Sequence, residues 1–310
     1  MTTISRRLFI GLGAAALGET LLGGADGDLL PLGVITYSFA SMPMTPFSTS
    51  RYARAAGLTA LELKIEHLQQ DAGAPGGGKR INGFSKDLRK QYDDWFATRT
   101  IADYRALRRR YDDLGVSIHT LKTVLGPKKC REGGTADFWC EVAKELGADT
   151  VSMESPKPAE WAEKGPFFAA LAKKHDLRFA FHNHLALQPD TYDGPESLLA
   201  CSDRLGLCFD VGHFTAKNGR AAVMPFVRKH ASRLFALHIK DRKELDVKTP
   251  ACPMGEGDVP FKEIFAFVRD EGLKVRGDVE LEYGYDRKTT DAVKEVARCA
   301  AWCRRKFKEV

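Results

Sequence analysis

The stretch "DDLGVSIH" at residues 112–119 decides the fold, because it joins the end of a helical pattern directly to a strand-like run. Glycine just after the last helical residue is a common stop signal, and Gly115 holds that position. The same joint returns as "KELGADTV" at 144–151 and as "RDEGLKVRGDVEL" at 269–281. A recurring joint of this kind predicts an array of βαβ units.

Eight short runs of strand length recur along the chain, and amphipathic helical patterns separate them. The runs lie at 31–39, 60–65, 116–122, 149–154, 178–183, 205–210, 233–240 and 277–283. Eight such units predict an α/β fold, a single closed (β/α)8 TIM barrel over residues 29–310. A doubly wound sheet is the alternative. It needs a glycine-rich phosphate loop after the first strand, and "TYSFASMPMT" at 36–45 has none.

One segment between the second and third strands is irregular. Residues 66–95 contain the glycine run "APGGGKR" and many polar residues. We expect a long loop here, at the C-terminal end of the second strand. On a barrel, that position lies over the mouth where active sites form.

The N-terminus has the layout of an export signal. "SRRLFIGLGAAALGETLLGGADG" at 5–27 places the pair Arg6-Arg7 before a mostly apolar run and then small residues. Residues 1–28 are therefore predicted to be a twin-arginine signal peptide, which places the mature protein in the periplasm or outside the cell. Glu19 interrupts the apolar run, and a short N-terminal helix with two chance arginines is the alternative.

Bulk composition excludes several classes of partner. The 310 residues are 44% hydrophobic and carry a formal net charge of +6, with basic residues scattered along the chain. A nucleic-acid partner would need a concentrated basic stripe, which is missing from the sequence. After residue 28 no apolar segment approaches the ~20 residues that span a bilayer, so we expect no stable membrane span in the mature protein.

Four consecutive strand-like runs end in polar side chains of metal-ligand type. The fifth ends in His182-Asn183-His184, the sixth in Asp210, the seventh in His238, and the eighth contains Glu280 and Glu282. In a barrel these strand ends converge on one mouth. Burying several carboxylates together is costly unless a cation offsets their repulsion. Imidazole and carboxylate ligands together suit a divalent ion, and the choice among Mn²⁺, Zn²⁺, Co²⁺, Fe²⁺ and Mg²⁺ stays open.

Each of these residues also has a purely structural explanation. Asp210 can be the N-cap of the next helix. His238 can be a hydrogen-bonded core histidine, and Glu280 and Glu282 can form ion pairs with lysines on the solvent-exposed rim of the barrel. These explanations do not account for the coincidence of such residues on successive strands.

Other polar residues at strand ends are candidates for contact with a substrate. His213 follows Asp210 by three residues, and Lys240 alternates with His238, so a lysine beside the metal can stabilise a developing oxyanion. Glu280 is the candidate general base, ahead of Glu282 and Glu154. His184, Glu154 and Glu282 are also candidates for contact with the substrate, and Glu62, Lys64 and Lys122 are weaker ones.

The phrases "GLCFDVGHF", "LFALHIKDR", "MGEGDVPFKEIF" and "GDVELEYGY" together resemble the sugar phosphate isomerase/epimerase superfamily, a group of xylose isomerase-like TIM barrels. The resemblance covers nearly all of the chain after residue 28. It implies a divalent metal held by an acidic residue after the fifth strand, an Asp after the sixth, a His after the seventh and a Glu after the eighth. The last three fall on Asp210, His238 and Glu280, and His213 matches a residue that contacts substrate in the epimerases.

The first ligand departs from the pattern of the superfamily. Where many members have a glutamate in an "ENH"-like phrase, this chain has His182, which gives "HNH". Epimerisation by two bases needs one group on each face of the sugar carbon. With His182 at this position, either the histidine takes over the role of that base or the chemistry differs. We expect an exported, metal-dependent sugar or cyclitol isomerase or epimerase that removes a proton next to a carbonyl group. A lyase or dehydratase, a hydrolase of an oxidised sugar, and a carbohydrate-binding barrel without turnover remain alternatives, and the sequence does not indicate the oligomeric state.

Overall fold

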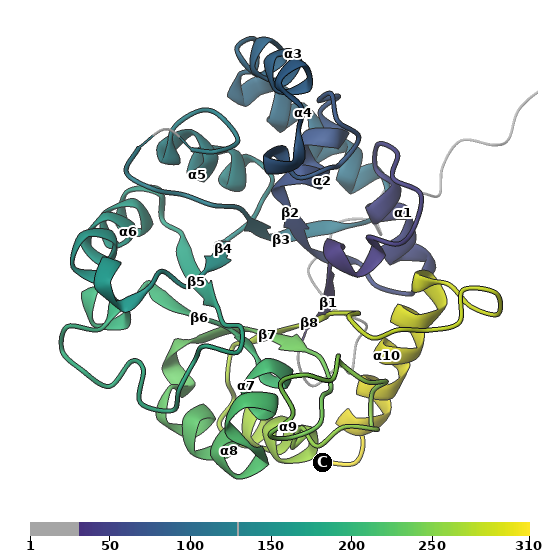
Figure 1. The fold of residues 1–310 in the computed structure, drawn as a ribbon, viewed down its shortest axis with the longest axis vertical. Helices are drawn as coiled ribbons and strands as arrows, with labels where there is room; N and C mark the ends of the chain where they lie inside the picture. Colours follow the sequence, from purple (N-terminus) through teal and green to yellow (C-terminus); the bar gives the residue numbers. More distant parts are fainter. Residues whose placement is uncertain (1–30, 129) are drawn as a thin grey trace, which may run out of the picture.

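The computed structural model describes residues 31–128 and 130–310 and confirms the predicted barrel. Eight parallel strands pair in chain order, and β1 pairs with β8 to close the sheet (Figure 1). The strands are β1 (Leu32–Ile35), β2 (Ala60–Lys64), β3 (Ser117–Lys122), β4 (Thr150–Glu154), β5 (Arg178–His182), β6 (Leu205–Asp210), β7 (Leu234–Ile239) and β8 (Arg276–Val279).

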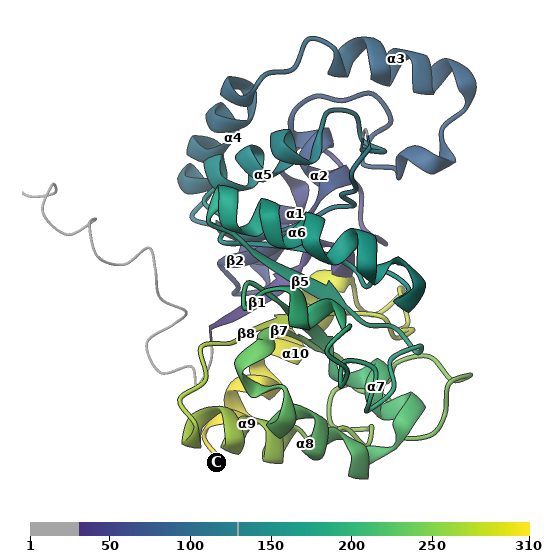
Figure 2. The same ribbon diagram turned by 90° about the vertical axis from the view of Figure 1, so that its left-hand side faces the viewer.

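The α-helices form a layer outside the strands (Figures 1 and 2). They are α1 (Ser48–Ala55), α2 (Ile65–Asp71), α3 (Lys86–Phe96), α4 (Ile101–Asp113), α5 (Ala136–Glu145), α6 (Trp161–His175), α7 (Val211–Asn218), α8 (Arg220–Lys229), α9 (Phe261–Asp270) and α10 (Ala292–Phe307). Short 3-10 helices cover Thr36–Phe39, Ile81–Gly83, Pro158–Glu160, Leu198–Cys201 and Ala231–Arg233. Among the described residues, no helix has both the length and the hydropathy needed to cross a bilayer.

The helix-to-strand joints behave as their sequence predicts. Gly115, Gly147 and Gly272 follow α4, α5 and α9 with φ values of 67°, 83° and 58°. This left-handed conformation is easy for glycine and lets the chain turn back toward the next strand. The apolar core between strands and helices is continuous. For example, Phe168 on α6 packs against Phe179 and Phe181 on β5, with ring centroids 5.7 and 5.5 Å apart.

Two predictions about local structure were wrong. Residues 66–95 are not a long loop, because most of α2 and nearly all of α3 lie within them, and α3 lies outside the ring of the other helices (Figures 1 and 2). The side chain of Ser85 caps α3 by accepting a hydrogen bond from the backbone of Leu88. The eighth strand ends at Val279, so Glu280 and Glu282 follow the strand instead of belonging to it. The predicted signal, residues 1–28, lies outside the described residues.

Candidate metal centre

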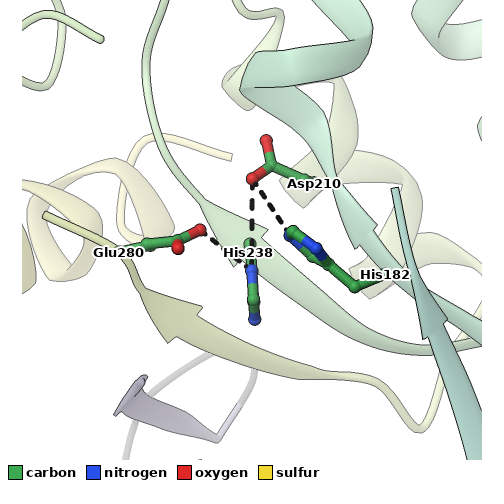
Figure 3. A group of neighbouring side chains, drawn as sticks. All are labelled: His182, Asp210, His238 and Glu280. Atoms are coloured by element: carbon green, nitrogen blue, oxygen red, sulfur yellow. Dashed lines mark ion pairs between the residues drawn. The ribbon is translucent and has the colours of Figure 1, made fainter. Parts of the chain in front are cut away.

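Four side chains from consecutive strand ends converge at the mouth of the barrel (Figure 3). Each offers one ligand atom, and the four atoms lie within 4.8 Å of one another. Asp210 Oδ2 is 3.5 Å from His182 Nε2 and 4.0 Å from His238 Nδ1, and Glu280 Oε2 is 2.9 Å from the same His238 nitrogen. All four residues are at most 7% exposed. Parallel strands that end on one face of a closed barrel produce this convergence.

The inward atoms of this group lack ordinary partners. Within the described part of the chain, His182 Nε2, Asp210 Oδ2, His238 Nδ1 and Glu280 Oε2 are buried and make no hydrogen bond. Buried polar atoms normally find a partner, and four such atoms gathered at one place are an arrangement that could hold a cation.

The second nitrogen or oxygen atoms of His182, His238 and Asp210, which point away from the centre, are hydrogen-bonded. His182 Nδ1 lies 3.0 Å from Glu154 Oε2, and His238 Nε2 lies 2.9 Å from Glu62 Oε2. A carboxylate on the far nitrogen of a metal-binding histidine fixes the ring and its tautomer. Asp210 Oδ1 accepts a hydrogen bond from the backbone N–H of His213 at 2.7 Å, which leaves Oδ2 for the centre. Asp210 is therefore an N-cap and a candidate ligand at once.

The electrostatics of the cluster favour a divalent cation. With neutral histidines, the cluster has two negative charges in excess, because five carboxylates lie among three lysine or arginine side chains. These charged residues are Glu62, Glu154, Asp210, Glu280, Glu282, Lys122, Lys240 and Arg242. The pKa of His238 responds to this excess: burial opposes its protonation, but Cys208 and Glu62 raise the pKa well above its ordinary value. Two imidazole nitrogens and two carboxylate oxygens are a donor set that fits a first-row divalent ion.

Lys240 lies beside the centre, as the alternation of β7 predicts. Its ammonium is 1% exposed and lies 2.9 Å from Asp210 Oδ2 and 3.0 Å from Glu280 Oε2. Glu282 Oε2 accepts a hydrogen bond from the same ammonium at 2.6 Å. Burial would raise the pKa of Glu280, but Lys240 and His238 hold it well below its usual value, so this carboxylate stays ionised at neutral pH.

His213 lies next to Lys240 on the first turn of α7. Its Nε2 is 3.1 Å from Lys240 Nζ, and its Nδ1 accepts a hydrogen bond from Arg242 at 3.0 Å. Burial lowers the pKa of His213 to about 4 and Lys240 acts in the same direction, whereas Asp210 opposes them. The ring is therefore neutral at pH 7.

The other residues predicted to contact a substrate lie either buried behind the ligands or at the open mouth of the barrel. Glu62 is fully buried behind His238, where Ser152 Oγ also donates to it at 2.8 Å. Its position points to support of His238 instead of the direct substrate contact expected from the sequence. At the open mouth, His184 Nε2 lies 2.9 Å from Glu154 Oε2, and Lys122 Nζ lies 3.2 Å from Glu154 Oε1. Lys64 is buried and paired with Glu66 at 2.8 Å.

Sequence reasoning missed two residues that shape the site. Asn183 ties the ends of β5 and β6 together, since its side chain accepts from Asp210 N at 2.8 Å and donates to Asp210 O at 3.1 Å. Arg242 is 6% exposed and supports His213. Both follow a candidate ligand closely in the sequence, in "HNH" and "HIKDR", and that proximity was the available signal.

Comparisons with known proteins agree with the barrel fold. A family model described as a xylose isomerase-like TIM barrel matches residues 50–306. The chain is 28% identical to an inosose dehydratase of Salmonella agona, over 32% of this chain and 38% of that protein. It is 27% identical to an inosose dehydratase of Lactiplantibacillus plantarum, over 38% of this chain and 47% of that protein. The alignments thus span less than half the length of these curated relatives.

A crystal structure of a sugar phosphate isomerase/epimerase from Parabacteroides distasonis has the same fold. It matches with a TM-score of 0.57 and 19% identity, over 91% of this chain and 98% of that chain.

Proposed function

This chain belongs to the xylose isomerase-like TIM barrel family, and from that premise we propose that it is a metal-dependent enzyme that removes a proton next to a carbonyl group of a sugar or cyclitol. The observation that carries the proposal is the set of four buried ligand atoms that lie within 4.8 Å of one another at the barrel mouth and make no hydrogen bond within the described residues. We assign isomerisation or epimerisation as the outcome of that proton removal.

Four residues would hold the metal: His182, Asp210, His238 and Glu280. A divalent ion bound there supplies Lewis acidity, which makes a carbon-bound proton beside a carbonyl easier to remove. Glu154 and Glu62 orient the two imidazole rings from behind. Asn183 holds the backbone of Asp210 and thereby keeps neighbouring ligands at a fixed spacing.

The chain also provides the groups that the proton transfer needs. Glu280 is ionised and is the candidate general base, since the pKa of its carboxyl is held low by Lys240 and His238 although burial opposes this. Lys240 and neutral His213 present N–H donors on the α7 side of the centre and can stabilise negative charge on a substrate oxygen. His184 and Glu154 border the open side, where they can position hydroxyl groups.

A dehydratase is the second candidate function, and two observations favour it. The curated relatives are inosose dehydratases, although their alignments cover only part of each chain. In addition, His182 stands where the resemblance predicts a glutamate, so a second carboxylate base is missing from that position. Removal of one proton followed by loss of a hydroxyl group needs a base on one face only.

The test is hydrogen exchange at carbon. We would incubate the protein with an inosose and with a ketohexose in D2O, before and after chelation and with Mn²⁺ added back, and follow deuterium incorporation by mass spectrometry. We expect metal-dependent exchange that Glu280→Gln reduces at least about 100-fold. Unchanged exchange in the metal-free protein would contradict the mechanism. Ligand binding without exchange, unaffected by Glu280→Gln, would identify a binding barrel.

A further inference from the structure

We propose that the pocket beside the metal centre is a subsite for an anionic group of the substrate, a carboxylate or a phosphate. This pocket, called the basic pocket below, has a volume of about 120 Å³. Its lining includes four cationic and two acidic side chains: Lys64, Arg80, Lys122, Arg131, Glu66 and Glu154. The inference rests on the proposed function and adds the charge of the substrate to it.

The basic pocket and the metal centre are neighbours, because Glu62 and Glu154 each lie between Lys122 and a histidine of the centre. Glu62 Oε1 is 3.9 Å from Lys122 Nζ, and Glu62 Oε2 is 2.9 Å from His238 Nε2. Glu154 similarly lies 3.2 Å from Lys122 and 3.0 Å from His182. One carboxylate side chain therefore lies between Lys122 and each of the two histidines, which places the pocket directly beside the ligands.

The basic pocket and the metal centre together have a positive excess only when a divalent ion is counted. Beyond the residues counted at the metal centre, the pocket adds Lys64, Arg80 and Arg131. Two carboxylates oppose these three cations: Glu66 pairs with Lys64 at 2.8 Å and with Arg80 at 3.4 Å, and Glu132 pairs with Arg131 at 2.5 Å. Once a divalent ion offsets the negative excess at the centre, one positive charge remains. An anionic ligand group would compensate it.

Two of the pocket lysines have little exposed surface, and one of them makes no hydrogen bond within the described residues. Lys122 Nζ is buried and makes no hydrogen bond within the described residues, although Glu154 and Glu62 lie within ion-pair range. Lys64 is 6% exposed, and burial lowers the pKa of its ammonium because Glu66 offsets only part of the lost solvation. Buried ammonium groups with hydrogen-bonding capacity left are suited to an oxyanion.

Arg80 and Arg131 complete the basic pocket from the outside. Their side chains are 60% and 39% exposed, and Arg80 comes from the segment between α2 and α3. Guanidinium groups bind carboxylate and phosphate oxygens through paired N–H donors. The segment after β2 would thus contribute to substrate recognition through Arg80, whereas α3 itself lies outside the ring of helices and would not take part.

The experiment compares anionic and neutral sugars on Mn²⁺-loaded protein at constant ionic strength. Calorimetric titration would use D-glucuronate, D-glucose 6-phosphate and D-glucose. We expect at least one anionic sugar to bind about 10-fold or more tightly than glucose, the range that a charge-assisted hydrogen bond gives. The tighter of the two anions distinguishes a carboxylate subsite from a phosphate subsite.

A double variant tests whether this preference arises in the basic pocket. Arg80→Gln/Arg131→Gln should remove the preference, whereas Arg89→Gln/Lys90→Gln on α3, a control with the same loss of charge, should keep it. Equal binding of all three sugars, or a preference that survives in the pocket variant, would overturn the inference. A failure of the proposed function would be distinguished from this outcome, because the wild-type protein would then fail to bind Mn²⁺ or to catalyse deuterium exchange.

Discussion

His182 holds the position where the resemblance predicts a glutamate, and its surroundings give this substitution a physical meaning. The ring turns Nε2 toward Asp210 and receives Glu154 on Nδ1. The negative charge is therefore displaced by one side chain, from the ligand itself to the residue behind it. A carboxylate behind an imidazole raises the basicity of the ring as a ligand.

At the residue scale, Glu62 provides the sharpest test of the metal centre. Glu62→Gln removes the charge behind His238 while keeping the shape, and we expect Mn²⁺ affinity to fall about 10- to 100-fold. Competition with a fluorescent chelator would measure the affinity. Ser152→Ala, which removes only the other hydrogen bond to Glu62, should change it less than about 3-fold. Equal affinities for Glu62→Gln and wild type would show that Glu62 does not support the ligand.

The residues of the site differ in how far sequence reveals them. Asp210, His238 and Glu280 could be found because each interrupts or directly follows an apolar strand pattern. The position of Glu62 could not be predicted. Alternation along β2 places Glu62 and Lys64 on the same side of the strand but does not show how deeply each side chain is buried. In the structure Glu62 is completely buried, whereas Lys64 reaches the basic pocket.

At the scale of elements, strands were easier to predict than the connection after β2. Strand runs such as 205–210 are buried along their whole length, so the apolar pattern is unbroken. The run "GAPGGG" between α2 and α3 suggested a loop, and glycines there do have positive φ. Flanking helices nevertheless form, because the apolar side of α2 packs into the core and Tyr92 on α3 is buried.

Asp71, the last residue of α2, gives this region a pH-dependent stability. Its carboxyl group accepts hydrogen bonds from Phe47 N at 2.5 Å and from the Tyr111 hydroxyl at 2.7 Å. Burial raises the pKa of Asp71 from 3.8 to about 6. The folded protein therefore holds this proton more tightly than the unfolded chain. The resulting stability is present below about pH 4 and is lost as the pH rises through 6.

We expect Asp71→Asn to remove this pH dependence. Between pH 4 and pH 7, the unfolding free energy of the wild type should fall by about 2 kcal/mol relative to the variant. Urea denaturation at several pH values would measure the difference. Parallel curves for the two proteins would mean that Asp71 titrates normally.

At the scale of the whole molecule, we propose that residues 1–28 direct export through the twin-arginine route. A folded fluorescent reporter fused behind residues 1–30 should appear in the periplasm of a bacterium that has this route. Arg6→Lys/Arg7→Lys should keep the reporter in the cytoplasm, because the route reads the arginine pair. Cytoplasmic retention of the unaltered fusion would contradict the proposal.

The eightfold architecture was predictable as a whole because its evidence is repeated. A wrong boundary in one unit, such as the early end of β8, leaves the other units intact. The net charge around the barrel mouth was not predictable, because it depends on which of the many lysine and glutamate side chains lie close together in the folded protein. Lys122 and Glu154, for example, belong to adjacent strands, and only the folded register brings their charged ends to 3.2 Å.

The pairing of β1 with β8 has a consequence for protein synthesis. Leu32 pairs with Gly277, so the first strand leaves the ribosome long before its partner exists. Until then the growing sheet has two open edges, which are templates for association with other chains. We expect a product truncated before β8 to aggregate even though it contains most of the barrel, because the last strand completes the sheet and also removes both of its edges.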